Sequence, residues 1–151
     1  MLKMTDVSKV YPGGSVALQN VDIHIEPGEF VFVVGPSGAG KSTFIKMLFR
    51  EVLPTTGSIF VNGVDILELT PKEIPYMRRQ LGIIFQDYKL INEYTIEENI
   101  MIPLKINGYS DEISKDQANK LLAHVRLSHR AGYYPNELSG GEQQRVAVAR
   151  A

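Results

Sequence analysis

The residues best suited to chemistry form a glycine-rich run that leads into Lys41, Ser42 and Thr43. The run reads Gly35-Pro36-Ser37-Gly38-Ala39-Gly40 and, with the next two residues, fits the pattern G-x-x-x-x-G-K-S/T. Glycines let backbone N–H groups curl around a phosphate, and Lys41 adds a positive charge for the β and γ phosphates. Ser42 offers a hydroxyl to Mg²⁺, and Thr43 can reach the α phosphate. We therefore predict a nucleotide-phosphate site at residues 35–43.

A second candidate anion site is the segment Leu138-Ser139-Gly140-Gly141-Glu142. Ser139 and Glu142 have the spacing of a capping box, which predicts that Ser139 is the N-cap and that the two glycines begin a helix. Glycine costs about 1 kcal/mol relative to alanine inside a helix, but it leaves the first amides bare to an incoming anion. The alternative is a capped helix that merely tolerates two glycines.

These sites need elements to position them. The segments LKMTDV and VDIHIE predict strands separated by Pro12-Gly13-Gly14, and residues 30–34 are apolar on both faces, as in a central strand of a parallel sheet. Strand, glycine-rich loop and helix in that order are the context that the phosphate motif requires. The helix after the loop is predicted over residues 41–53 from its apolar spacing: Phe44, Ile45, Leu48, Phe49 and Val52.

The following segments continue the alternation of strands and helices. Asn62-Gly63 predicts a hairpin, Thr70 to Glu73 predicts a helix start with proline at its first position, and residues 81–86 predict a second buried strand. Residues 87–138 are predicted to be helical. Their signals are a capping box of Thr95 with Glu98 and an apolar stripe of Ile113, Gln117, Leu121, Leu122 and Val125.

Composition narrows the possible functions. The chain has 151 residues, is 44% hydrophobic and has a net charge of −1, so it has no general attraction for nucleic acid. It has no cysteine, which excludes disulfides and thiolate metal sites. No apolar run approaches the roughly 18 residues that span a bilayer. If the chain acts at a membrane, a partner must therefore hold it there.

With these motifs in view, GPSGAGKST, FQD and LSGGEQQR resemble, in that order, the nucleotide-binding domain of ATP-binding cassette (ABC) proteins. The resemblance implies an α/β P-loop NTPase fold. It would have an N-terminal antiparallel β subdomain, a parallel-sheet core and an α-helical subdomain. The expected division is residues 1–86 for the β subdomain and core, residues 87–138 for the helical subdomain and residues 139–151 for the signature helix.

The resemblance also implies roles for single residues. ATP and Mg²⁺ are the expected ligands, with Lys41 and Gln86 as catalytic residues and with Ser42 and Gln86 at the metal. Tyr11 would stack on adenine, although a tyrosine before Pro-Gly-Gly can simply lie on the surface. The signature residues would bind the nucleotide of a second protomer: Ser139, Gly140, Gly141 and Glu142.

Partners follow from the same resemblance. We expect a nucleotide-dependent homodimer, held at the cytoplasmic face of the membrane by an integral membrane protein that the segment from Asp87 to Tyr94 would face. The sequences of these segments resemble the cell-division branch of the family more than its lipoprotein-release and macrolide-export branches. The cell-division branch implies an indirect link to peptidoglycan hydrolases. Those branches remain alternatives.

The family pattern also contains an Asp-Glu pair after a further strand, and residues 1–151 hold none in that context. We expect a chain truncated after the signature motif, with an exposed apolar edge and without ATP hydrolysis. Asp87 after the apolar segment 81–86 could stand in for the missing aspartate, but it lacks the adjacent acid. A nucleotide-binding fragment without turnover therefore remains open, and a P-loop kinase is disfavoured because kinases do not need LSGGE.

Overall fold

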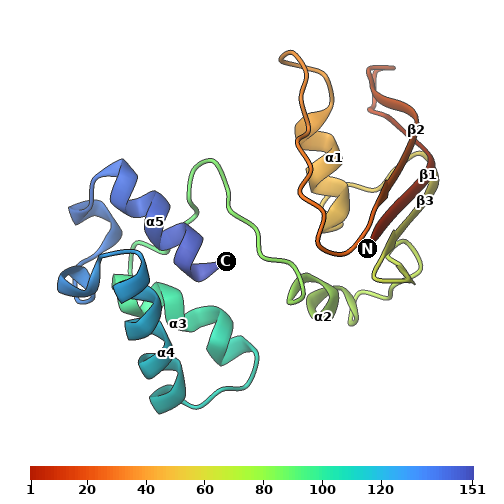
Figure 1. Ribbon diagram of the computed structural model, residues 1–151. Helices are drawn as coiled ribbons and strands as arrows, with labels where there is room; N and C mark the ends of the chain where they lie inside the picture. The colour runs from red at the N-terminus through yellow and green to blue at the C-terminus, as the bar shows by residue number, and fades with distance from the viewer. The chain divides into compact units, whose positions relative to one another are not determined.

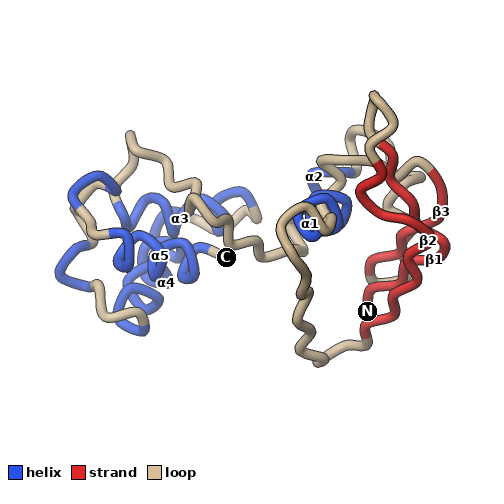
Figure 2. Tube along the Cα trace, turned by 90° about the horizontal axis from the view of Figure 1, so that it is seen from above, coloured by secondary structure: helices blue, strands red, loops and turns tan.

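The computed structural model describes residues 1–151 as two compact units, Met1–Gln80 and Leu81–Ala151. The first unit contains all the strands and the second is helical (Figures 1 and 2). No helix is both long and apolar enough to cross a membrane. The boundary between the units lies six residues before the predicted boundary after Gln86, and the predicted three-part division stays a prediction.

The first unit is built on a four-stranded antiparallel sheet, drawn in red in Figure 2, with the order β2-β1-β3-β4. The strands are β1 (Leu2–Val10), β2 (Val16–Ile25), β3 (Thr56–Val61) and β4 (Val64–Asp65). Its buried side chains include Met4, Val7 and Ile59. The predicted hairpin is confirmed, because Val61 pairs with Val64 and both Asn62 and Gly63 have the positive φ of a tight hairpin turn.

The first helix of this unit ends earlier than predicted, and the second begins later. Helix α1 (Lys41–Leu48) ends five residues early, because Arg50 has a φ of 57° and its guanidinium donates to the carbonyls of Leu67 and Leu69. Helix α2 (Ile74–Arg78) begins after a turn at residues 71–73 and not at Pro71, although Glu73 does accept the predicted bonds from Thr70.

The predicted strands at residues 30–34 and 81–86 are wrong, since neither segment forms a strand. A strand needs a neighbour to accept and donate its backbone hydrogen bonds, and the sheet of residues 1–151 has no strand paired with either segment. Apolar side chains are consequently exposed, as expected for an unpaired edge. Phe30 is 84% exposed, Val34 is 85% exposed, and the rings of Phe30 and Phe32 contact each other edge to face at 5.0 Å.

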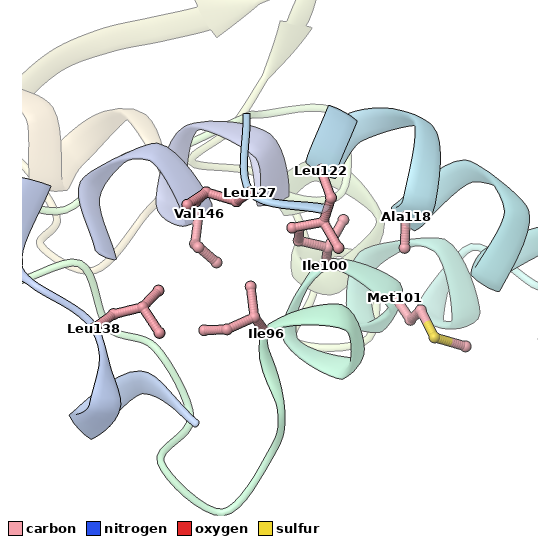
Figure 3. Close-up of a cluster of buried hydrophobic side chains, with 8 residues drawn as sticks. All are labelled: Ile96, Ile100, Met101, Ala118, Leu122, Leu127, Leu138 and Val146. Atoms are coloured by element: carbon pink, nitrogen blue, oxygen red, sulfur yellow. The ribbon is translucent and has the colours of Figure 1, made fainter. Parts of the chain in front are cut away.

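The second unit packs three helices around one apolar cluster: α3 (Ile96–Ile106), α4 (Asp111–His124) and α5 (Gly140–Arg150). Two short 3₁₀ helices, Ser128–Arg130 and Pro135–Glu137, lie between α4 and α5. Figure 3 shows the cluster: Ile96, Ile100, Met101, Ala118, Leu122, Leu127, Leu138 and Val146. The predicted stripe on α4 is partly wrong. The buried row is Ser114, Ala118 and Leu122, while Ile113 is exposed.

Candidate nucleotide-binding site

Two glycines of the loop at residues 35–40 have left-handed backbone angles. Gly38 and Gly40 have φ angles of 82° and 84°, in the left-handed region that side chains disfavour. Gly40 is also crowded, because a Cβ atom built there would lie 2.2 Å from the carbonyl oxygen of Ala17 on β2. A Cβ atom at Gly38 would meet nothing within 4 Å. The close approach of Gly40 to β2 thus fixes the loop beside the sheet.

The end of this loop presents backbone donors. Gly40 is the N-cap of α1 and provides no side-chain cap, and the first helical hydrogen bond runs from the Phe44 N–H to the Gly40 carbonyl at 2.8 Å. The amides of Lys41, Ser42 and Thr43 precede that bond, so the helix itself supplies no acceptor for them. Three free amides at a helix N-terminus, where the helix dipole is positive, form a site that suits phosphate.

Lys41 adds a charge to these donors. Its Nζ atom donates to the carbonyl oxygens of Gly35 at 2.7 Å and Pro36 at 2.8 Å, so the side chain lies over the loop. Lys41 has no carboxylate partner among the ion pairs of residues 1–151. Its positive charge is therefore available to an anion in the loop.

A cavity of about 350 Å³ lies beside the loop, large enough for part of a nucleotide. It is lined by Tyr11, Ser15, Val16, Ala17 and the loop and helix residues 37–43. The structure therefore brings Tyr11 to the start of α1, where it contacts Thr43 across 32 positions of sequence. Its hydroxyl lies 3.2 Å from Thr43 Oγ1, and Lys9 Nζ lies 5.2 Å from the centroid of its ring. Stacking of adenine on this ring stays a prediction.

The protein side chains available for Mg²⁺ are few. Residues 1–151 contain no cluster of three or more His, Cys, Asp or Glu side chains that could hold a metal ion. The exposed Ser42 hydroxyl fits an ion that arrives with its nucleotide, because Mg²⁺ commonly keeps several waters and takes phosphate oxygens as ligands. Gln86 is exposed in the second unit, and its predicted role at the metal stays a prediction.

The signature segment forms the predicted capping box at the start of α5. Ser139 is the N-cap, its Oγ accepts from the Glu142 N–H at 3.4 Å, and its own N–H donates to Glu142 Oε2 at 2.9 Å. Both glycines are exposed. A Cβ atom on Gly141 would meet nothing within 4 Å, and one on Gly140 would come no closer than 3.7 Å to the Tyr88 hydroxyl. Internal packing therefore does not require glycine at either position.

Glu142 is held in its charged form at this cap. Hydrogen bonds from the hydroxyl and the N–H of Ser139 lower the pKa of the Glu142 carboxyl, and the charges of Arg130 and Arg145 act in the same direction. The Arg130 Nε atom lies 3.7 Å from Glu142 Oε1.

Sequence reasoning missed two side chains that fix the loop after Gln86. Arg150, in the last turn of α5, donates to the carbonyls of Tyr88 and Lys89, each at 2.7 Å. Burial of this guanidinium lowers its pKa. Asn99, fully buried on α3, bonds with both the N–H and the carbonyl of Ile91. Because these partners lie on other elements, no local pattern indicated them. One sequence signal could have indicated the second contact: Asn99 is a polar residue among the buried apolar residues of α3.

Asp87 is the alternative candidate for a metal-binding aspartate. It forms an exposed ion pair with Lys89 at 2.6 Å, and the Lys89 side chain lowers the pKa of the Asp87 carboxyl. It therefore already has a cationic partner in its own loop.

Comparison with known proteins agrees with this geometry. The sequence profile of the ABC transporter family matches residues 18–151, and the chain belongs to this family. Its fold is that of the ATP-binding cassettes. The dimeric post-hydrolysis state of the ATP-binding cassette MJ0796, bound to ADP and Pi, matches with a TM-score of 0.91 and 37% identity, over 99% of this chain and 68% of that one.

Within the family, the chain is similar to the cell division ATP-binding protein FtsE. It is 48% identical over 151 residues to FtsE of Bacillus subtilis (strain 168) and 45% identical to FtsE of Escherichia coli (strain K12). All of this chain is aligned in both cases, and it spans 66% and 68% of the two relatives, respectively. The chain therefore spans about two-thirds of the length of the curated relatives that it matches.

Proposed function

We propose that this chain is an FtsE-like ATP-binding subunit that binds MgATP at residues 35–43. The observation that carries the proposal is the glycine loop with the bare amides of α1, a Lys41 ammonium without a carboxylate partner and the cavity that Tyr11 also lines. Each of these features lies within the first unit. The similarity to cell division ATP-binding proteins supports ATP as the nucleotide.

Each residue of the loop has a distinct task in this proposal. The amides at the end of the loop hold the phosphates. Lys41 leaves the Gly35 and Pro36 carbonyls and neutralises the β and γ oxygens. Thr43, whose hydroxyl contacts the Tyr11 hydroxyl, would bind the α phosphate. The Ser42 hydroxyl would hold Mg²⁺, which would neutralise charge on the phosphate oxygens.

The signature end would act on a second copy of the protein. We propose that Ser139, Gly140, Gly141 and Glu142 close over the nucleotide of a partner protomer in an ATP-dependent homodimer. The exposed glycines and the lack of any internal contact that requires them support this role. The dimeric state of the cassette MJ0796 gives it further support.

We further propose a place for the subunit at the cytoplasmic face of the membrane. Its partner there would be an integral membrane protein like FtsX, contacted by the segment from Asp87 to Tyr94, with an indirect link to peptidoglycan hydrolases. The names of the relatives support the cell-division assignment over a lipoprotein-release or macrolide-export complex. The division into residues 1–86, 87–138 and 139–151 belongs to the same proposal.

The full-length protein would be an ATPase, whereas residues 1–151 would bind ATP without turning it over. Gln86 can orient water, but no carboxylate of residues 1–151 occupies the context of a general base after the signature helix. A chain that only binds nucleotide is the second candidate function.

The test is calorimetric titration of residues 1–151 with MgATP, beside steady-state phosphate release. We expect binding that Lys41→Ala weakens at least tenfold and no turnover above background. The proposal is wrong if the chain does not bind MgATP, or if Lys41→Ala leaves the affinity for MgATP unchanged. A full-length protein without MgATP hydrolysis, alone or with its membrane partner, would leave only the binding function, and phosphate transfer to an acceptor other than water would favour a kinase.

A further inference from the structure

The Ser139 hydroxyl is engaged inside its own helix cap. Its Oγ donates to Glu142 Oε2 at 2.7 Å, and the same carboxylate oxygen accepts the Ser139 N–H at 2.9 Å. A hydroxyl has one proton to donate. While that proton is given to Glu142, Ser139 offers an incoming phosphate oxygen only lone pairs, which repel it. The proposed function of this segment therefore requires that Glu142 release the hydroxyl.

A replacement donor for Glu142 lies close by and is unused. The Nε atom of Arg130 is buried and has no hydrogen-bond partner, and it lies 3.7 Å from Glu142 Oε1. The guanidinium is held over the ring of Tyr133, 4.6 Å from its centroid. Charge-assisted N–H···O bonds are about 2.7–2.9 Å long, so a movement of about 1 Å by the carboxylate would form one.

We propose that Arg130 is a positioning residue for Ser139. When a nucleotide phosphate arrives, the Glu142 carboxylate moves onto the Arg130 Nε–H and the Ser139 hydroxyl turns its proton to the phosphate. The exchange satisfies a buried donor that is unpaired before binding, so the cost of breaking the bond between Ser139 and Glu142 is offset within the same cluster. This inference rests on the proposed role of the signature segment.

Arg145 provides a matched control. Its charge also acts on Glu142, but it is exposed and forms no ion pair or hydrogen bond with that residue. Replacing Arg145 removes one positive charge near the carboxylate and leaves the Arg130 Nε–H in place. A purely electrostatic role would make Arg130 and Arg145 equivalent, whereas the proposed exchange requires Arg130 alone.

The experiment is a titration of the ¹⁵N-labelled 151-residue chain with MgATP, followed by NMR. Amides of Gly38 and Gly40 report on the loop, those of Gly140 and Gly141 on the signature end, and the Arg130 Nε–H on its own hydrogen bond. We expect the Arg130 signal to move downfield together with the Gly140 and Gly141 signals. Arg130→Gln should weaken the signature response roughly 10- to 100-fold, the effect of one charge-assisted hydrogen bond, and leave the loop response unchanged.

The control variants separate positioning from a structural role. Arg145→Gln should leave the signature response within about twofold of the original, the scale of a screened surface charge. In a Ser139→Ala background, Arg130→Gln should have no further effect, because no hydroxyl remains to be released. Equal effects of the two arginine variants, or an Arg130→Gln effect that persists without the hydroxyl, would overturn the inference.

The remaining outcomes distinguish this inference from the proposed function. If MgATP shifts the signals of Gly140 and Gly141 but not those of Gly38 and Gly40, only the proposed loop site is overturned. If MgATP shifts the signals of Gly38 and Gly40 but not those of Gly140 and Gly141, the proposed role of the signature segment and this inference are both overturned. If Arg130→Gln does not fold, the unmodified chain decides, because an Arg130 Nε–H signal that stays fixed while Gly140 responds contradicts the exchange.

Discussion

Replacing Gly40 by alanine gives the sharpest test of the loop geometry. The new Cβ atom would lie 2.2 Å from the Ala17 carbonyl oxygen and 2.8 Å from Leu18 Cδ2, at a φ of 84°. The left-handed conformation costs an alanine about 1–2 kcal/mol, and overpacking against a fixed backbone costs about 1–3 kcal/mol more. The two costs sum to about 2–5 kcal/mol, and the lower entropy of the unfolded alanine chain offsets about 0.4–1 kcal/mol of this. We therefore expect Gly40→Ala to lower the free energy of unfolding by about 2–4 kcal/mol.

Gly38→Ala is the matched control for this change. Gly38 has nearly the same backbone angle, 82°, but open space where a Cβ atom would lie. Its cost of about 1–2 kcal/mol for the left-handed conformation is partly offset by the lower entropy of the unfolded alanine chain, about 0.4–1 kcal/mol. The expected loss is therefore about 1 kcal/mol, and the difference between the two variants isolates the steric contact with β2.

Urea unfolding followed by far-ultraviolet circular dichroism measures both variants, and stability discriminates better than nucleotide affinity because both positions belong to the proposed phosphate site. Equal losses of unfolding free energy would refute the reasoning, since they would show that the loop does not press against Ala17. A Gly40→Ala variant that retains its full stability would refute it more strongly.

Four further predictions concern other parts of the chain. Gly141→Ala should raise the thermal midpoint, because alanine is the better helix former by up to about 1 kcal/mol and has space there, while weakening the MgATP response of the signature end; a lower midpoint would contradict this. Tyr11→Phe should weaken MgATP binding less than Tyr11→Ala in calorimetry, because it removes only the hydroxyl bond to the phosphate-binding helix; equal losses would argue against stacking. Asn99→Ala should lower the free energy of unfolding, measured in urea, by about 2–3 kcal/mol, because it leaves buried backbone groups without a hydrogen-bond partner. The exposed control Asn107→Ala should lower it by under about 1 kcal/mol. The lowered pKa of Glu142 adds stability above the pKa of the unfolded carboxyl, near 4.5, and this part is lost as the pH falls through the lower folded value; Glu142→Gln should flatten that acid limb, and an unchanged pH profile would contradict it.

Sequence patterns predicted the features that depend on neighbouring residues. The capping boxes of Thr95 with Glu98 and of Ser139 with Glu142 each join residues three apart, and the structure contains both. The Asn62-Gly63 turn likewise depends on two residues with positive φ. Such bonds form within one turn of chain, so the residue types there determine them with little help from the rest of the fold.

Features that need a distant partner were predicted poorly. Residues 30–34 have the composition of a buried strand, but a strand exists only where another strand accepts its hydrogen bonds. The same reasoning explains the missed anchors. Arg150 contacts the carbonyl of Tyr88 across 62 positions, and no periodicity within α5 indicates that contact. The position of Tyr11 beside the loop was predicted only through the family resemblance.

The glycines of the two candidate phosphate sites differ in what the folded chain requires of them. The folded structure requires glycine at position 40, because the backbone angle there and the contact with Ala17 both disfavour a side chain. Gly141 has an ordinary backbone angle and open space, so alanine would fit and would favour the helix. A residue that lowers helix stability without serving any internal contact points to a requirement outside residues 1–151. The amides that it exposes lie at a helix N-terminus beside Ser139, and in the proposed function they bind the phosphate of another molecule.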